Sequence, residues 1–121
     1  MTTQEVANRY YELASQKKWV EIQDEFHDDN VVCQEPEHAV SRGIQVLTKG
    51  KEAVKAKGAA NRDMMEAQHS QYCSEPIVAG NFFSVVLKRD VTFKNKPRMQ
   101  FEEVCVFQVK DGKIVLEQFF Y

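Results

Sequence analysis

The chain changes its hydrophobic periodicity near residue 67, and this change constrains its fold more than any other feature of the sequence. Beyond this point apolar and polar residues alternate with the period of two that is typical of β-strands. The alternating segments are residues 67–79, 82–94, 98–109 and 113–121. Strands joined by turns as short as these pair antiparallel, because a parallel return needs a long crossover. The second half therefore predicts a mostly antiparallel sheet.

The first half shows the spacing of amphipathic helices instead. Thr2 followed by Glu5 fits a capping box, in which both side chains accept backbone N–H groups, so a helix should start there. Apolar residues then recur at intervals of three and four along one face. The elements expected in this half are helices over 2–16 and 18–27, a short strand over 31–35, an irregular loop over 37–48 and a helix over 50–65.

Helices followed by strands indicate an α+β fold, and the 121 residues are expected to form a single domain over residues 1–121. In the last two strands both alternating sets of residues are partly apolar. One set is Met99, Phe101, Cys105 and Phe107, and the other is Val104, Val106, Leu116 and Phe120. The helices can cover one apolar face, and a second copy of the sheet can cover the other. We therefore predict a homodimer through the sheet face.

Charge and composition exclude several classes of partner. The 16 basic and 18 acidic residues give a net charge of -2 without a long run of either sign. Neither a nucleic-acid-binding surface nor a membrane-surface patch is expected from this pattern. The N-terminus lacks the basic start and apolar run of a signal peptide, and no segment approaches membrane-spanning length. We expect no membrane partner and a cytoplasmic location.

The spacing of cysteine and histidine indicates no metal site. Cys33, Cys73 and Cys105 are scattered, odd in number and never paired as CxxC, so they predict buried reduced thiols. The three histidines also lack the spacing of metal ligands, and no nucleotide-binding motif is present. We expect neither a metal nor a cofactor.

Three segments carry a resemblance to a known superfamily: RYYELA and FHDDNVVCQEP near the start, and EEVCVFQVKDGKIVLEQFFY at the end. Together with the element order, they make the chain similar to the nuclear transport factor 2-like superfamily, which includes ketosteroid isomerases and SnoaL-like polyketide cyclases. The resemblance covers nearly the whole chain. It implies a cystatin-like cone, in which three N-terminal helices pack on a curved, mostly antiparallel sheet. It says little about chemistry, because this fold hosts many activities.

The resemblance to ketosteroid isomerase also implies roles for individual residues. That enzyme uses an acidic base and an oxyanion hole made of a tyrosine and a protonated aspartic acid. Its helix-one tyrosine falls on Tyr10 through RYYEL, and its base falls on Gln34 or Glu35, of which we take Glu35. The second oxyanion donor falls on Cys105. A thiol is a much weaker donor than a carboxylic acid, which argues against steroid-type isomerisation.

Glu103 and Glu117 are the two carboxylates most informative about chemistry. If residues 110–112 form a three-residue loop with Gly112 left-handed, Cys105 faces Glu117 and both glutamates share one face of the sheet. The resemblance implies that this face is the concave one beneath the helices. A two-residue turn would move Glu117 to the other face. Two carboxylates in an apolar site repel each other, so one pKa should rise toward neutrality and suit a general acid or base. Solvated or ion-paired positions at the sheet rim are the alternative.

The candidate catalytic residues are therefore Tyr10, Glu35, Glu103 and Glu117. The remaining residues expected to contact a ligand are Phe101, Cys105, Phe119, Tyr121, Asn61, Met65 and His69. The lysines of residues 49–57 are expected to form the solvated face of the third helix.

Three functions fit this reading. The first is a cofactor-independent isomerase or cyclase that acts on a small apolar carbonyl compound by proton abstraction and return, with Glu35 or Glu103 as base, Tyr10 as enolate donor and Glu117 as second acid. The second is a non-catalytic module that binds a lipid-like or aromatic metabolite. The third is a dimerisation domain whose concave side is filled by its own side chains.

Overall fold

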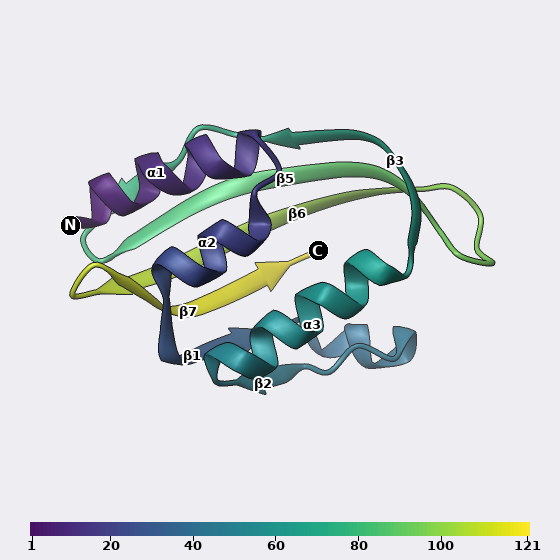
Figure 1. Ribbon diagram of the computed structural model, residues 1–121, viewed down its shortest axis with the longest axis horizontal. Coiled ribbons are helices and arrows are strands. Elements are labelled where there is room, and N and C mark those ends of the chain that lie inside the picture. The colour runs from purple at the N-terminus through teal and green to yellow at the C-terminus, as the bar shows by residue number, and fades with distance from the viewer.

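Three helices and one seven-stranded sheet make up the fold, and the computed structural model describes all residues from 1 to 121 (Figure 1). The helices are α1 (Thr3–Ser15), α2 (Trp19–Phe26) and α3 (Lys51–Asp63), with a short 3-10 helix η1 (Glu37–Arg42). The strands are β1 (His27–Gln34), β2 (Leu47–Lys49), β3 (Met65–Cys73), β4 (Ile77–Ala79), β5 (Phe82–Phe93), β6 (Met99–Lys110) and β7 (Lys113–Phe120). The predicted α+β class is confirmed.

Helix α1 starts where its sequence predicts. The Thr2 hydroxyl accepts the backbone N–H of Glu5 at 3.1 Å, and the Glu5 carboxylate accepts the backbone N–H of Thr2 at 2.9 Å. This reciprocal pair is a capping box, which satisfies two N–H groups that the first turn leaves free. The face of α1 turned to the sheet is apolar and buried: Val6, Ala7, Tyr10, Leu13 and Ala14.

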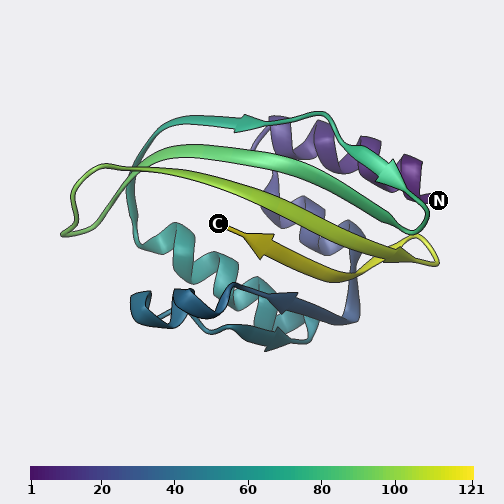
Figure 2. The ribbon, with the colours of Figure 1, turned by 180° about the vertical axis from the view of Figure 1, so that it is seen from behind.

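The sheet has the order β2-β1-β7-β6-β5-β3, and β4 also pairs with β5. Every pairing is antiparallel except that of β1 with β7, which is parallel. A parallel pair needs a long connection, and here all the elements from η1 to β6 lie between its two strands in sequence. Strand β1 thereby comes to lie beside the C-terminal strand (Figure 2).

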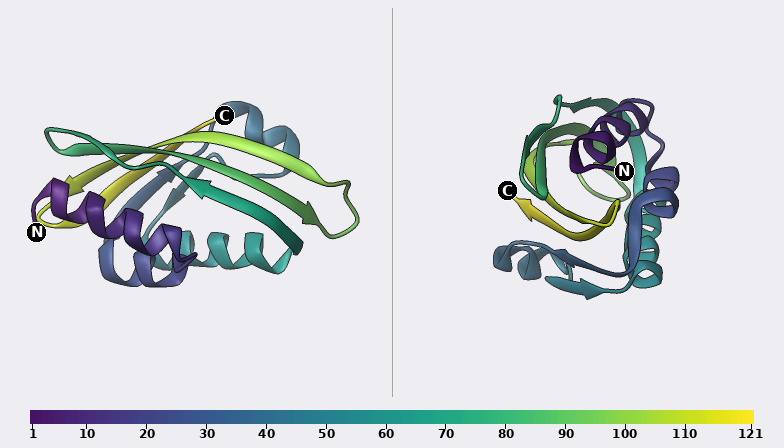
Figure 3. Two further views of the ribbon diagram at one scale, coloured as in Figure 1. Left: turned by 90° about the horizontal axis from the view of Figure 1, so that it is seen from above. Right: turned by 90° about the vertical axis from the view of Figure 1, so that its left-hand side faces the viewer.

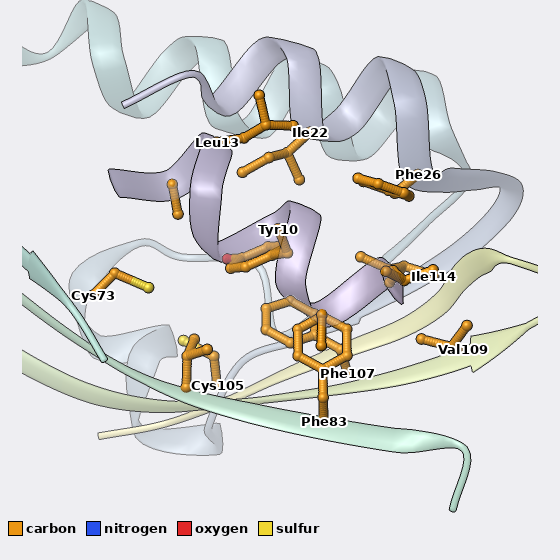
Figure 4. Packing of buried hydrophobic residues seen from close by; sticks show 14 of the residues in the cluster. Tyr10, Leu13, Ile22, Phe26, Cys73, Phe83, Cys105, Phe107, Val109 and Ile114 are labelled. Carbon is orange, nitrogen blue, oxygen red and sulfur yellow. The ribbon is translucent and has the colours of Figure 1, made fainter. Parts of the chain in front are cut away.

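The sheet curls around one side, where all three helices lie (Figure 3). Buried side chains from α1 and α2 meet inward-facing residues of β5, β6 and β7 in one hydrophobic core (Figure 4). At its centre the rings of Phe83 and Phe107 stack with centroids 4.7 Å apart, and Tyr10 lies 4.7 Å from Phe107. The other face of the sheet carries no helix. It exposes Val104 and Phe120, residues that are 43% and 49% accessible.

The expected irregular loop over 37–48 is wrong. Its first half forms η1, and its end forms strand β2, which pairs antiparallel with β1. The backbone N–H of Glu35 also donates to the carbonyl of Val46 at 2.8 Å, so the segment closes back on β1. A strand of three residues is too short to show a period in the sequence, and its pairing with β1 creates it.

The boundaries of two other strands also differ from the prediction. The first strand begins at His27 instead of residue 31. The expected strand over 67–79 is two strands, because pairing stops after Cys73 and resumes at Ile77. Pro76 lies in the break and has no N–H to donate to a neighbouring strand.

Candidate functional site

A turn and a bulge together decide which face Glu117 occupies. Lys110 pairs with Lys113, so the loop has two residues, Asp111 and Gly112, with φ of 51° and 74°. Of the two turns that the sequence left open, the two-residue turn is therefore the one that forms. Further along, Val109 pairs with Ile114 and Gln108 with Leu116, which leaves Val115 as an extra residue in β7. The shorter turn moves every following residue of β7 to the opposite face of the sheet. The extra residue of the bulge moves the residues beyond it back again.

Glu117 consequently lies opposite Phe107, and not opposite Cys105 as a three-residue loop would have placed it. Phe107 and Cys105 are two residues apart on β6, so Glu117 still shares their inward face with Glu103. The sequence analysis considered the two-residue turn and expected it to move Glu117 to the other face. That expectation is wrong, because the bulge at Val115 returns Glu117 to the inward face.

The Glu117 carboxylate is buried against an imidazole. His27 Nε2 lies 3.1 Å from Glu117 Oε2, and the two residues are only 3% and 8% exposed. His27 is the first residue of β1 and lies beside Ile114 of β7. Its other ring nitrogen, Nδ1, is buried and has no hydrogen-bond partner. The sequence analysis missed His27, because its position beside Glu117 depends on the parallel pairing of β1 with β7.

Glu35 directly follows β1, and its carboxylate accepts hydrogen bonds from two partners. Its Oε1 accepts from Lys57 Nζ at 2.7 Å, and its Oε2 accepts from the Tyr121 hydroxyl at 2.8 Å. Gln34 instead pairs with Gln118 on the outer face, so Glu35 and not Gln34 reaches the interior. Lys57 is mostly buried with a side chain 25% exposed, so the expectation that it belongs to a solvated face is wrong.

The surroundings of Lys57 change the pKa of its ammonium group. Burial disfavours its charged form, but the hydrogen bond to Glu35 and the nearby Cys33 and Glu35 outweigh burial and raise the pKa of the ammonium group. Lys57 therefore stays charged and offsets the negative charge of Glu35. Burial raises the pKa of the Cys33 thiol, which lies 3.4 Å from Lys57 Nζ, so it remains protonated.

Glu103 differs from Glu35 because no cation is paired with it. It forms no salt bridge, and its hydrogen bond comes from the Cys105 thiol, with Sγ 3.7 Å from Oε1. Burial raises the pKa of the Glu103 carboxyl above its ordinary value. The positive charge of Arg89 opposes this rise, while the charges of Glu35 and Glu117 add to it. A half-buried carboxylate of this kind is a stronger base than a solvated one.

Two phenols lie near these carboxylates. Burial, followed by the charges of Cys105 and Glu117, raises the pKa of Tyr10, so its hydroxyl stays protonated. That hydroxyl forms no hydrogen bond within the protein, and it points away from Phe83 and Phe107 toward the side where Cys73 and Cys105 lie (Figure 4). Burial and the hydrogen bond to Glu35 likewise raise the pKa of Tyr121. The neutral Tyr10 phenol can therefore donate a hydrogen bond to a ligand, whereas the single O–H of Tyr121 is already donated to Glu35.

A comparison with protein-family models identifies the family to which the chain belongs. A family model described as a SnoaL-like domain matches residues 1–121. The chain belongs to the SnoaL-like family. A Mesorhizobium loti protein provisionally described as a SnoaL-like polyketide cyclase is 30% identical, with a TM-score of 0.91 over 100% of both chains. No curated protein matches the chain.

More distant structures share the fold of this SnoaL-like domain. A Xanthomonas campestris protein with a cystatin-like fold is 14% identical, with a TM-score of 0.79 over 99% of this chain and 90% of its own. A Catenulispora acidiphila protein with a ketosteroid isomerase-like fold, solved with trimethylamine, is 14% identical, with a TM-score of 0.72 over 97% of this chain and 85% of its own. These likenesses confirm the predicted cystatin-like superfamily fold.

The remaining ligand candidates of the SnoaL-like domain occupy different places. Phe119 is half-buried and packs on the hydrophobic core opposite Cys105. Met65 is half-buried opposite Phe93, and exposed Asn61 accepts from Arg89 Nη1 at 3.5 Å. His69 does not join the site, because it is exposed and its ring hydrogen-bonds Thr92 Oγ1 on the outer face.

Two surface hollows of the SnoaL-like domain lie mainly over outward-facing residues of the sheet. The smaller, about 240 Å³, lies over Val86, Val104 and Phe120, and the larger, about 550 Å³, lies over strands β3, β5 and β6. No three His, Cys, Asp or Glu side chains lie close enough together to hold a metal ion. No helix has both the length and the hydropathy needed to span a membrane.

Proposed function

We propose that this SnoaL-like domain is a cofactor-independent isomerase or cyclase that moves a proton on a small, mostly apolar carbonyl compound, with Glu103 as the base. The observation that supports this proposal is the state of Glu103. Its carboxylate is desolvated, has a raised pKa and lacks a paired cation. A base with these properties can remove a proton from carbon at neutral pH more readily than a solvated carboxylate.

In the proposed reaction, Glu103 removes a proton from the carbon next to the substrate carbonyl. The electron pair of that C–H bond forms a C=C bond, and the negative charge moves to the carbonyl oxygen. The neutral Tyr10 phenol, whose pKa is raised by burial, donates a hydrogen bond to this enolate oxygen. In an isomerase, Glu103 then returns the proton to a different carbon. In a cyclase, the enolate carbon attacks a second carbonyl carbon, and Glu103 gives its proton to the alkoxide that forms.

Glu35 is less suited than Glu103 to the role of base. Its two oxygens already accept hydrogen bonds from Lys57 and Tyr121, and the lysine stabilises the charged carboxylate. We assign Glu35 and Lys57 to holding the Tyr121 ring in place at the end of the chain. Glu117, next to His27, is the candidate for a second acid.

The partner proposed for the outer face is a second copy of the chain. Val86, Val104 and Phe120 lie together there, since Val104 is opposite both Val86 and Phe120 in the register. Two of these side chains are exposed although they are apolar. Covering such a patch with its own copy removes apolar area from water on both molecules.

The alternative is a binding module that holds a small apolar ligand without converting it. Cys105 favours this alternative, because burial raises the pKa of its thiol and its proton is directed to Glu103. A thiol in this state cannot replace the acidic donor that ketosteroid isomerase uses for its second oxyanion bond.

Exchange of carbon-bound hydrogen tests the proposal. We would incubate the protein with 2-tetralone in D₂O and follow loss of the proton signals next to the carbonyl by NMR. The wild-type protein should exceed the rate in buffer alone, and Glu103→Gln should return it to that rate. Tyr10→Phe should slow protein-dependent exchange by about 10- to 100-fold.

Glu102→Gln is the matched control, because Glu102 precedes Glu103 but points outward and is exposed. It should leave exchange unchanged. Binding of 2-tetralone without faster exchange would favour the binding module, and equal loss of exchange in both glutamine variants would remove the case for Glu103 as base.

A further inference from the structure

Two guanidinium groups flank one aromatic ring at the edge of the concave face. The Cζ of Arg42 lies 5.9 Å from the centroid of the Phe101 ring, and the Cζ of Arg89 lies 5.7 Å from the same centroid. Asn61 completes the group through Arg89. These four residues, here named the rim cluster, come from four separate elements: η1, β5, β6 and α3.

The position of Arg89 is unusual for a charged residue. In the register it lies opposite Phe101 on β6 and Gln71 on β3, both of which face inward. It follows Phe83, Val85 and Leu87, which occupy the preceding inward positions of β5 and are buried. A cation on such a face loses hydration, and this loss is ordinarily offset by a paired carboxylate.

Neither arginine of the rim cluster has such a partner. Seven ion pairs form in the protein, and none includes Arg42 or Arg89. The contact of Arg89 with Asn61, at 3.5 Å, is long, and Arg42 forms no hydrogen bond from its side chain. Arg98, by comparison, binds Asp90 through two nitrogens at 2.8 and 2.7 Å. The rim cluster therefore presents free guanidinium donors.

The rim cluster adjoins the proposed base. Phe101 and Glu103 are two residues apart on the same face of β6, which places them about 7 Å apart along the strand. This distance is close to the length of one aromatic ring with its substituents. A planar molecule held by one end at the rim cluster would extend toward Glu103.

We propose that Arg42 and Arg89 bind the carboxylate of a planar, conjugated substrate, whose other end reaches Glu103. Guanidinium groups form charge-assisted hydrogen bonds with carboxylates, and the Phe101 ring offers a flat surface for stacking. The proposal rests on the function proposed above and names its substrate class as an aromatic or polyene carboxylic acid. A neutral steroid-like ketone lacks the group that the rim cluster would recognise.

Binding of cinnamate and of cinnamamide, measured by calorimetry in low salt, tests this proposal. The two probes have nearly the same shape and differ in charge. Cinnamate should bind about tenfold more tightly than cinnamamide, as expected for one charge-assisted pair. Arg89→Gln and Arg42→Gln should each remove most of this preference while binding of cinnamamide stays the same.

Lys88→Gln is the matched control, since Lys88 precedes Arg89, carries the same charge and is exposed on the outer face. It should leave the preference intact. Equal binding of the two probes, absence of cinnamate binding at millimolar concentration, or an equal effect of all three variants would each overturn the proposal.

Failure of this inference can be separated from failure of the proposed function. If hydrogen exchange of 2-tetralone depends on Glu103 but the protein binds cinnamate no more tightly than cinnamamide, the base assignment stands and the carboxylate site is wrong. If cinnamate binds through the arginines but Glu103→Gln leaves the rate of 2-tetralone exchange unchanged, the carboxylate site is correct and the protein is a binding module.

Discussion

At the scale of single residues, the state of Glu103 arises from its place in the alternation of β6. Glu102, one position earlier in the strand, is exposed, and its carboxylate is paired with Lys88 at 3.4 Å. Glu103 faces inward, between Cys105 and Phe101 in the same row, and it loses water without gaining a paired cation. A shift of one residue in a strand thus separates a surface ion pair from a candidate base.

The raised pKa of Glu103 predicts how stability depends on pH. The folded protein holds this proton to a higher pH than the unfolded chain does, so ionisation of Glu103 destabilises the fold. Its contribution to stability is complete below the unfolded pKa and declines as pH rises through the folded pKa. Glu103→Gln removes this ionisation and should gain about 1 kcal/mol in unfolding free energy, relative to wild type, between pH 4 and pH 8.

Urea unfolding of both proteins at pH values from 4 to 8 measures this difference. A constant difference between wild type and Glu103→Gln across the range would show that the carboxyl titrates normally in the folded state.

The residues of the site were predictable to different degrees. Alternation along one strand was enough to place Glu103 and Cys105 on the same face. The motif before Pro36 pointed to Glu35, although its partner Lys57 lies 22 positions away on a helix and carries no signal in the sequence. His27 was unpredictable, because its partner Glu117 is 90 positions away and joined to it only by the parallel pairing.

At the scale of elements, the β6–β7 hairpin determines which side chains reach the interior. Its two-residue turn requires positive φ at both central residues, a conformation that glycine and asparagine adopt at low cost. The bulge at Val115 then restores the inward position of Glu117. The sequence left the register of this hairpin open, because it could not distinguish a two-residue turn with a bulge from a three-residue loop.

Substitution of Gly112 tests the strained turn. Gly112→Ala should lower the unfolding free energy by about 1 kcal/mol, since alanine resists a φ of 74°. A Cβ at this position would also lie 3.3 Å from the Met1 nitrogen. Gly112→Asn carries the same Cβ but tolerates left-handed φ, so it should cost less than Gly112→Ala in chemical denaturation. An equal loss in the two variants would assign the effect to the contact with Met1 instead of the backbone.

At the scale of the whole molecule, the helices cover one face of the sheet and leave the other bare (Figures 2 and 3). The division into a helical first half and a strand-rich second half was readable from the sequence, because each half keeps its own period. The closing of β2 and β1 onto β7 was not, since it depends on contacts between distant segments.

The bare face predicts the oligomeric state. We expect a dimer at micromolar concentration, measured by sedimentation velocity, and a monomer for Val104→Glu, which places a charge in the apolar patch. Leu47→Glu is the matched control, because Leu47 is 43% exposed, as Val104 is, but lies on β2 away from the patch. A monomeric wild type, or dissociation by both variants, would rule out an interface at this patch.

The ionisation of Glu103 is the property on which the proposed chemistry depends. NMR titration of the ¹³Cδ resonance of this residue, assigned by its loss in Glu103→Gln, measures that ionisation directly. The structure predicts a midpoint clearly above the 4.5 of an unperturbed glutamate, because burial raises the pKa of this carboxyl. A midpoint at or below 4.5 would show a solvated carboxylate, and Glu103 could then not serve as the proposed base.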